Sequence, residues 1–166
     1  MGSGKTTQGN RISNRLNIDF FDLDQEIESR YRLSVFDFFL KYGEDAFRKI
    51  ESNVLRSLSE NENYVISTGG GTPCFNNNME WMNRTGITFY IKMQEGVLIN
   101  RLAASKTKRP LLMGKTDEEV ALFVKNQLAE REYYYKQAHY ELDGMSFDAD
   151  MVPAIIENHY TSYMSL

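Results

Sequence analysis

The sequence predicts an α/β domain in which helices flank a parallel β-sheet in three layers. Short β-rich runs alternate along the chain with longer segments in which apolar residues recur every three or four positions, a pattern typical of strands alternating with helices. Glycine- or acid-rich turns lie where these strands are expected to end. Because ligands of such domains gather at the carboxyl ends of the strands, these turns are the first place to look for a site.

The first half of the chain is predicted to be mostly helical. A helix over residues 5–16 follows a glycine-rich turn and places its apolar residues on one face. A short apolar run over 18–23 ends in acids. The helical pattern then continues from 24 to 59, and Gly43 is expected to break it into separate helices.

The second half repeats the alternation of strand and helix. Its β-rich runs lead directly into helical segments, one of which opens with a capping sequence at Thr116. The elements expected here are strands over 64–67 and 86–92, helices over 94–104 and 116–135, a weak strand near 140–142 and a last helix over about 151–163.

Length and composition indicate one globular domain that spans residues 1–166. Hydrophobic residues make up 42% of the chain and charged residues 25%, which is enough for a packed core. The formal charge of -4 gives no basic excess, so we expect no nucleic-acid or membrane partner. The single cysteine, Cys74, cannot form an intrachain disulfide and is expected to be a packing residue, and no signal peptide or membrane-length apolar run is visible. These features favour a cytoplasmic protein.

The first residues match part of a phosphate-binding loop. Gly2-x-Gly4-Lys5-Thr6 corresponds to the second half of the pattern G-x-x-x-x-G-K-[ST], in which backbone N–H groups wrap phosphate oxygens at a helix N-terminus. Lys5 would bridge the β- and γ-phosphates, and the Thr6 hydroxyl would bind Mg²⁺. A tag-like start with chance glycines is the alternative, but the amphipathic helix that follows favours the P-loop NTPase fold.

The first half of this loop lies outside the 166 residues. We therefore expect that Met1 is an internal methionine of a longer natural protein, whose preceding strand would be central in the sheet and buried on both faces.

Two acids follow the first apolar run. Asp22 and Asp24 are two residues apart at an expected strand end, so one can serve Mg²⁺ while the other meets a substrate hydroxyl. Asp24 could instead cap the next helix, and the two roles are compatible.

Three consecutive glycines, Gly69 to Gly71, follow the strand over 64–67. Glycines in such a position suit a place where backbone approaches a ligand closely, although a plain loop is the alternative. Arg48 lies in a helix whose opposite face is apolar, and by itself is interpreted as a solvated surface arginine. The run Tyr133 to Tyr135 is expected to divide between core and surface, and His139 and His159 as lone histidines are not expected to be catalytic.

Taken together, six motifs resemble the shikimate kinase family, and the resemblance covers essentially the whole chain. The motifs are Met-Gly-Ser-Gly-Lys-Thr-Thr at 1–7, Phe-Phe-Asp-Leu-Asp-Gln-Glu-Ile-Glu at 20–28, Gly-Glu-Asp-Ala-Phe-Arg at 43–48, Thr-Gly-Gly-Gly at 68–71, Lys-Arg-Pro-Leu-Leu at 108–112 and Glu-Arg-x-x-x-Tyr at 130–135. The resemblance implies transfer of the γ-phosphate of ATP to the 3-hydroxyl of shikimate, giving shikimate 3-phosphate and ADP in aromatic amino acid biosynthesis. It also implies a monomer.

The resemblance further implies roles for individual residues. Asp24 is the expected base and substrate ligand, and Asp22 would help Thr6 to hold Mg²⁺. Arg48 and Arg131 would clamp the shikimate carboxylate. The remaining roles are Gly70 as a backbone N–H donor to a substrate hydroxyl, Arg109 as a catalytic and ATP-binding arginine, and Gly2, Ser3, Gly4, Lys5, Thr6 and Thr7 as the ATP-binding loop, with Lys5 also catalytic.

Two larger segments are assigned in the same way. The substrate-binding helices would span about 24–60, and a mobile lid that carries Arg109 would span about 105–116. Another small P-loop kinase, acting on gluconate or a nucleoside monophosphate, is the nearest alternative. A nucleotide-binding module without catalysis is the other.

Overall fold

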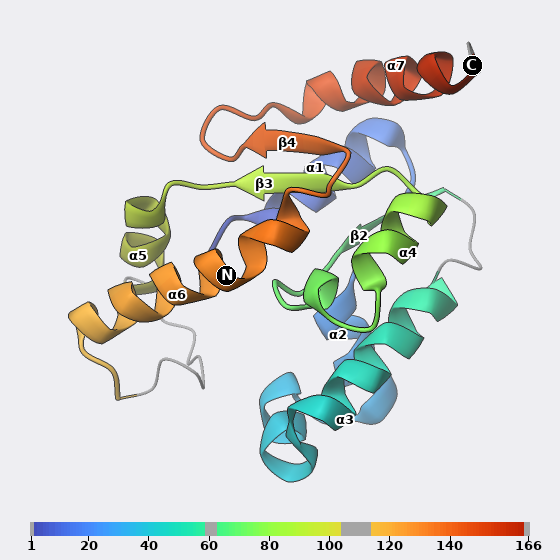
Figure 1. Cartoon of the computed structure of the whole chain (residues 1–166). Coiled ribbons are helices and arrows are strands. Elements are labelled where there is room, and N and C mark those ends of the chain that lie inside the picture. The colour runs from blue at the N-terminus through green and yellow to red at the C-terminus, as the bar shows by residue number, and fades with distance from the viewer. Residues whose placement is uncertain (1, 59–62, 104–113, 165–166) are drawn as a thin grey trace.

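The computed structural model describes residues 2–58, 63–103 and 114–164. The expected alternation of helix and strand is confirmed, with boundaries within a few residues of those predicted (Figure 1). In chain order the elements are α1 (Lys5–Leu16), β1 (Asp19–Asp22), α2 (Leu23–Tyr31), α3 (Val35–Leu58), β2 (Tyr64–Ser67), the 3₁₀ turn η1 (Thr72–Cys74), α4 (Asn78–Thr85), β3 (Phe89–Lys92), α5 (Glu95–Ala103), α6 (Asp117–Tyr135), β4 (Tyr140–Asp143), the 3₁₀ turn η3 (Ala149–Met151) and α7 (Val152–Met164).

Both strand pairings among the described residues are parallel, as expected, but the four strands form two separate pairs rather than one sheet. β1 pairs with β2 from Asp19↔Tyr64 to Asp22↔Ser67, and β3 pairs with β4. Between the pairs lies a cavity of about 740 Å³, whose lining includes Val65 of β2 and Ile91 of β3. The expectation of a further central strand outside the 166 residues stays a prediction.

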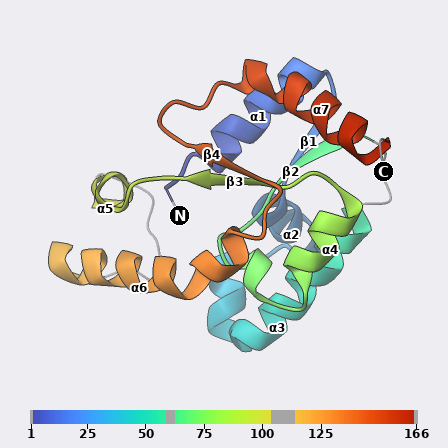
Figure 2. The same ribbon diagram turned by 45° about the horizontal axis from the view of Figure 1, so that its top comes forward.

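Helices cover both faces of the strands. Figure 2 shows α1 and α7 on one side and α2, α3 and α4 on the other, with α5 and α6 beyond one end of β3. No helix in the described ranges is both long and apolar enough to cross a bilayer. The three-layer arrangement therefore follows the prediction, and the carboxyl ends of β1 and β2 open toward α2, η1 and α6.

The buried apolar residues form separate clusters. The first joins α2 to α3 through Leu23, Ile27, Phe38, Phe47, Val54, Leu55 and Leu58. The second joins α5 to α6 through Met93, Leu98, Leu102, Val120 and Val124. A third packs Ile12 of α1 against Ala149 and Val152. Each cluster fixes one group of helices, and the first two groups lie on opposite sides of the turn that follows β2.

Two local signals in the sequence are confirmed by backbone geometry. Gly43 has φ 78° and ψ 172° and kinks α3, as its place in the pattern predicted. Thr116 caps α6 in a capping box with Glu119. The lid over 105–116 lies largely outside the described residues, which resume at Gly114.

His139 provides a prediction on acid stability. Its Nδ1 accepts a hydrogen bond from the Thr88 backbone N–H at 3.2 Å, and its ring lies 4.9 Å from that of His159. Burial, followed by the charge of His159, lowers the pKa of His139 below its usual 6.5. The unfolded chain therefore binds a proton more readily than the folded one, so stability is present above pH 6.5 and falls as the pH drops below it. Urea unfolding midpoints at pH 7.5 and 5.5 should differ less in His139→Gln than in the unmodified chain.

Candidate active site

The glycine-rich start of the chain leads directly into α1. Gly2 and Gly4 have φ values of 72° and 83°, in the left-handed region that glycine tolerates. The helix begins at Lys5, its first backbone bond runs from the Gln8 N–H to the Gly4 carbonyl at 2.9 Å, and no side chain caps the first turn. The N–H groups of that turn and the positive end of the helix dipole make this position suited to an anion.

Asp22 connects the N-terminal turn to the next helix. Its Oδ2 accepts a hydrogen bond from the Thr6 hydroxyl at 2.8 Å, and its Oδ1 accepts one from the Asp24 backbone N–H at 3.1 Å. Asp22 is therefore the N-cap of α2, and the interpretation of Asp24 as the cap is wrong because the helix begins one residue earlier, at Leu23. Asp24 lies in the first helical turn, where its carboxylate is not used for capping.

The donors near α1 fit a magnesium ion better than a metal held by protein alone. No group of three or more His, Cys, Asp or Glu residues that could hold a metal ion occurs within the described part of the chain. Thr6 and Asp22 place a hydroxyl and a carboxylate side by side, and Mg²⁺ is commonly bound by one or two such oxygens together with phosphates and water.

Asp24 has an environment that makes it a stronger base than a free aspartate. Burial raises its pKa, the nearby Lys5 cation lowers it, and the charges of Asp22, Glu51 and Glu28 raise it, with a net rise above 3.8. The carboxylate thus lies among groups from α1, β1 and α3. A general base gains efficiency as its pKa approaches the working pH.

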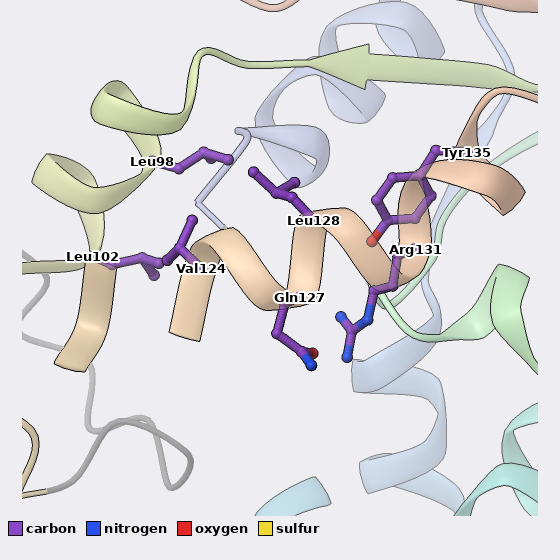
Figure 3. A pocket seen from close by; sticks show the side chains of 7 residues that line it. All are labelled: Leu98, Leu102, Val124, Gln127, Leu128, Arg131 and Tyr135. Carbon is purple, nitrogen blue, oxygen red and sulfur yellow. The ribbon is translucent and has the colours of Figure 1, made fainter. Parts of the chain in front are cut away.

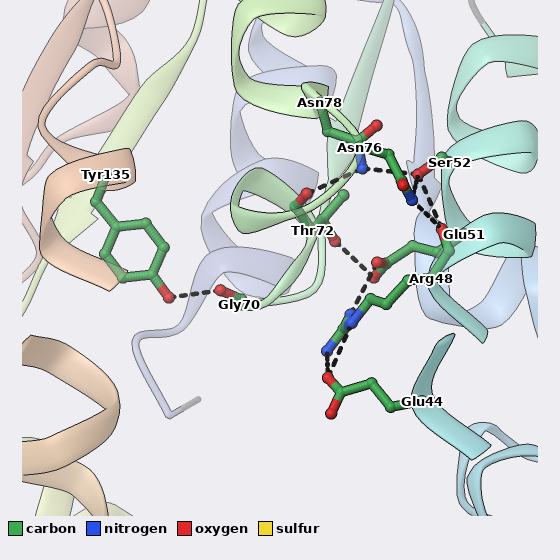
Figure 4. Close-up of polar contacts among 9 residues, drawn as sticks. All are labelled: Glu44, Arg48, Glu51, Ser52, Gly70, Thr72, Asn76, Asn78 and Tyr135. Atoms are coloured by element: carbon green, nitrogen blue, oxygen red, sulfur yellow. Dashed lines mark hydrogen bonds and ion pairs between the residues drawn. The ribbon is translucent and has the colours of Figure 1, made fainter. Parts of the chain in front are cut away.

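Arg48 is buried rather than solvated, so the interpretation from its helix alone is wrong. Its side chain is 10% exposed and forms ion pairs with Glu51 at 2.8 Å and Glu44 at 2.9 Å. Glu51 is 1% exposed and also accepts a hydrogen bond from the Thr72 hydroxyl at 2.7 Å (Figure 4). Arg48 is thereby held in one position relative to the turn that follows β2.

Two of the three glycines, Gly69 and Gly71, allow this turn to pass between charged side chains. A Cβ at Gly71 would overlap the Arg48 guanidinium, and one at Gly69 would lie 3.1 Å from Glu51 Oε1 and 3.4 Å from Asp24 Oδ1. The carbonyl of Gly70 accepts a hydrogen bond from the Tyr135 hydroxyl at 2.6 Å. A plain loop would not need glycines here, so the close approach of side chains explains the sequence.

Arg131 approaches the same region from α6. Figure 3 shows its guanidinium beyond the apolar lining of a pocket of about 30 Å³ between α5 and α6, and close to Tyr135. Burial raises the pKa of the Cys74 thiol, whereas the charges of Arg131 and Arg48 lower it. Both arginines therefore lie near one side chain of η1. The raised pKa of Cys74 agrees with a packing role rather than a nucleophilic one.

The structure thus brings together residues that are far apart in the sequence. Asp24 and Arg48 lie against the glycine turn, Arg48 and Arg131 lie near Cys74 of η1, and Lys5 is close enough to Asp24 to lower its pKa. Arg109 lies outside the described residues. Ser3 lines the large cavity together with Lys5, Gly69 and Gly70, and Thr7 is exposed.

Three residues of the site were not predicted from the sequence. Glu51 and Thr72 form the network behind Arg48, and Tyr135 appeared only as part of a motif without a role. Glu51 could have been found from the sequence, because it lies three residues after Arg48 on a helix, a spacing at which side chains of opposite charge can pair. The contacts of Thr72 with Glu51 and of Tyr135 with Gly70 join segments far apart in the sequence, so no local pattern predicts them.

Comparison with known proteins gives a consistent result. The family model described as shikimate kinase matches residues 1–158. The shikimate kinase of Bacteroides thetaiotaomicron is 47% identical over 140 residues, which make up 84% of this chain and 80% of the relative. The shikimate kinase of Aquifex aeolicus is 40% identical over 156 residues, or 94% of this chain and 89% of the relative.

Solved structures agree with the sequence matches. The crystal structure of the Bacteroides thetaiotaomicron shikimate kinase has a TM-score of 0.85 at 40% identity and covers 100% of this chain and 94% of its own. The Acinetobacter baumannii shikimate kinase in complex with shikimate has a TM-score of 0.82 at 30% identity and covers 98% and 89%. The three-layer P-loop fold expected from the sequence is confirmed by these neighbours.

Proposed function

We infer the roles of the site residues from one premise: the chain belongs to the shikimate kinase family. Shikimate kinases are ATP-dependent phosphotransferases that act on shikimate, and this activity, expected from the sequence, is confirmed by relatives of 40–47% identity over most of the chain. A gluconate kinase, a nucleoside monophosphate kinase and a non-catalytic module find no support among these matches.

One observation carries the assignment of residues. A basic carboxylate, two arginines and a glycine turn come from α2, α3, α6 and the end of β2, yet they meet at the glycine turn and at η1, which follows it. A carboxylate-bearing polyol needs such a set, because its acid group requires arginines and its hydroxyl requires a base.

The phosphate side of the reaction is assigned to α1. The N–H groups that follow Gly4 would hold the phosphates of ATP, and Lys5 would neutralise charge that develops on the transferred group. Thr6 and Asp22 would hold Mg²⁺, which when bound neutralises negative charge on the phosphate oxygens and so reduces their repulsion of the attacking hydroxyl oxygen.

The acceptor side is assigned to the groups around η1. Arg48 and Arg131 would bind the shikimate carboxylate, and the Gly70 N–H would donate to a hydroxyl. Asp24 would then take the proton of the 3-hydroxyl as that oxygen attacks the γ-phosphate, producing shikimate 3-phosphate and ADP. Arg109 and the lid over 105–116 remain predictions for closing the site.

The assignment of roles extends to the domain as a whole. We propose that residues 1–166 act as one catalytic domain and as a monomer, as the family resemblance implies. The single cysteine fits the reducing conditions of the cytoplasm.

A substrate panel tests this function. ADP release is measured in a coupled assay with ATP, Mg²⁺ and one acceptor at a time: shikimate, gluconate or a nucleoside monophosphate. We expect release with shikimate alone. Release with gluconate or the monophosphate and none with shikimate would overturn the assignment.

Gly71→Ala should weaken shikimate binding through Arg48. The added methyl group overlaps the guanidinium, and such overpacking costs about 1–3 kcal/mol of unfolding free energy. Because the arginine must move, the KM for shikimate should rise about tenfold or more while the KM for ATP changes little. Gly96→Ala is the matched control, since a Cβ there meets nothing within 4 Å. Equal KM values in the two variants would contradict the prediction.

A further inference from the structure

We propose that Tyr135 is a positioning residue for shikimate, whose hydroxyl orients the glycine turn and ties it to the helix that carries Arg131. This inference rests on the proposed function of the site. It concerns a residue for which no role follows from composition, spacing or the reaction itself.

The contact that carries the proposal joins two distant segments. Tyr135 is the last residue of α6, and its hydroxyl donates to the Gly70 carbonyl at 2.6 Å across 65 positions of sequence (Figure 4). That distance lies at the short end of the range for hydrogen bonds between hydroxyl and carbonyl groups. The phenol is half-buried, and burial raises its pKa, so it remains a donor at neutral pH.

Fixing one carbonyl of the turn also fixes an N–H group. In a trans peptide, the C=O of Gly70 and the N–H of Gly71 point in opposite directions. Holding the carbonyl toward Tyr135 therefore directs the Gly71 N–H away from α6. It also limits the backbone rotation of Gly70, whose own N–H is the donor assigned to the substrate hydroxyl. Glycine has a wider range of allowed backbone conformations than any other residue. Without this hydrogen bond, the peptide between Gly70 and Gly71 would therefore rotate more freely than a peptide between other residues. The neighbouring bonds, from the Thr72 N–H to the Gly69 carbonyl at 3.1 Å and from the Cys74 N–H to the Gly71 carbonyl at 2.9 Å, do not restrain the Gly70 carbonyl.

The phenol ring is itself held in place. It packs against Tyr90 of β3, with ring centroids 5.0 Å apart. Arg131 lies one helical turn earlier on the same face of α6, close enough that its charge lowers the pKa of Tyr135, which burial raises. The Tyr135 hydroxyl is thus the point at which a substrate-binding arginine and a substrate-binding turn meet. A shift of α6 would move both together.

The adjacent tyrosines supply a control. Tyr133 is 73% exposed, and its ring packs on that of Tyr134 at 5.3 Å rather than on the glycine turn. Replacing either Tyr133 or Tyr135 by phenylalanine removes one hydroxyl from the same helix and preserves the ring. Only the second change removes the bond to Gly70.

The experiment compares Tyr135→Phe with Tyr133→Phe and the unmodified chain. The KM for shikimate, and the Kd for shikimate measured by calorimetry without ATP, should rise about fivefold to tenfold in Tyr135→Phe alone. Its kcat should stay within about threefold, and its KM for ATP should be unchanged. With ¹⁵N-glycine labelling, the Gly71 amide should exchange faster with solvent in Tyr135→Phe and not in Tyr133→Phe.

Three other results would each contradict either the positioning role of Tyr135 or the proposed function. An unchanged Kd for shikimate in Tyr135→Phe would remove the positioning role. A fall in melting temperature accompanied by equal losses for shikimate and ATP would show that Tyr135 serves folding alone, and would also overturn it. Failure of the unmodified chain to phosphorylate shikimate would instead count against the proposed function, and the shikimate Kd and Gly71 exchange would still test the contact.

Discussion

Asp24→Asn is expected to lower kcat with shikimate by about 10²–10⁴-fold, the usual contribution of a general base, while ATP still binds. The asparagine has nearly the same shape but cannot take the proton of the attacking hydroxyl. Helix α2 should be unaffected, because Asp22 provides its N-cap. The measurements are turnover by ADP release and the Kd for ATP by calorimetry.

The acid side of the pH profile gives a second readout of the same group. Because burial raises the pKa of Asp24 above 3.8, turnover of the unmodified chain should fall on acidification at a higher pH than for a free aspartate. The residual turnover of Asp24→Asn should lack this fall. Glu26→Gln, on the same helix, is the matched control and should behave as the unmodified chain does; Glu26 forms an ion pair with Arg30 at 3.8 Å on the surface of α2. Full activity in Asp24→Asn would show that another group accepts the proton.

Arg48→Ala is expected to abolish measurable shikimate binding and to cost about 3–5 kcal/mol of unfolding free energy. The stability cost arises because Glu51, 1% exposed, would keep a buried charge without its main partner. Urea denaturation and shikimate titration measure the two effects separately.

A double variant separates binding from stability. Arg48→Ala with Glu51→Gln removes the unpaired charge and should recover part of the lost stability, yet shikimate should still fail to bind. Lys49→Ala, at the exposed neighbouring position on α3, should change neither quantity. Normal shikimate binding by the double variant would show that Arg48 supports the fold without touching the substrate.

Much of the fold could be predicted because its signals are local. The strand over 64–67, the kink at Gly43 and the cap at Thr116 each depend on a few adjacent residues, and the structure confirms all three. The N-cap of α2 was placed two residues too late, at Asp24 instead of Asp22, because both aspartates are good caps and only the fold decides between them.

The site was less predictable from single residues than from their combination. Arg48 alone indicates a surface residue, but it is buried because Glu51 and the glycine turn close around it. The bond from Tyr135 to Gly70 depends on where α6 ends relative to β2, a relation that no local pattern contains. Tyr133 is exposed, as the run of tyrosines predicted, whereas Tyr134 and Tyr135 are half-buried and the expected core position is not found among the three.

The separate apolar clusters imply that the two arginines belong to different cooperative units of unfolding. Arg48 extends from the unit built by α2 and α3, and Arg131 from the unit built by α5 and α6. Units with their own cores open at different free energies, so we expect α5 and α6 to open locally while α3 stays folded. A ligand that bridges the arginines would suppress that opening, and native-state hydrogen exchange in α6 would slow in proportion to its concentration over Kd. Bound shikimate would then hold the unit of α2 and α3 and the unit of α5 and α6 together, and its release would allow them to open separately.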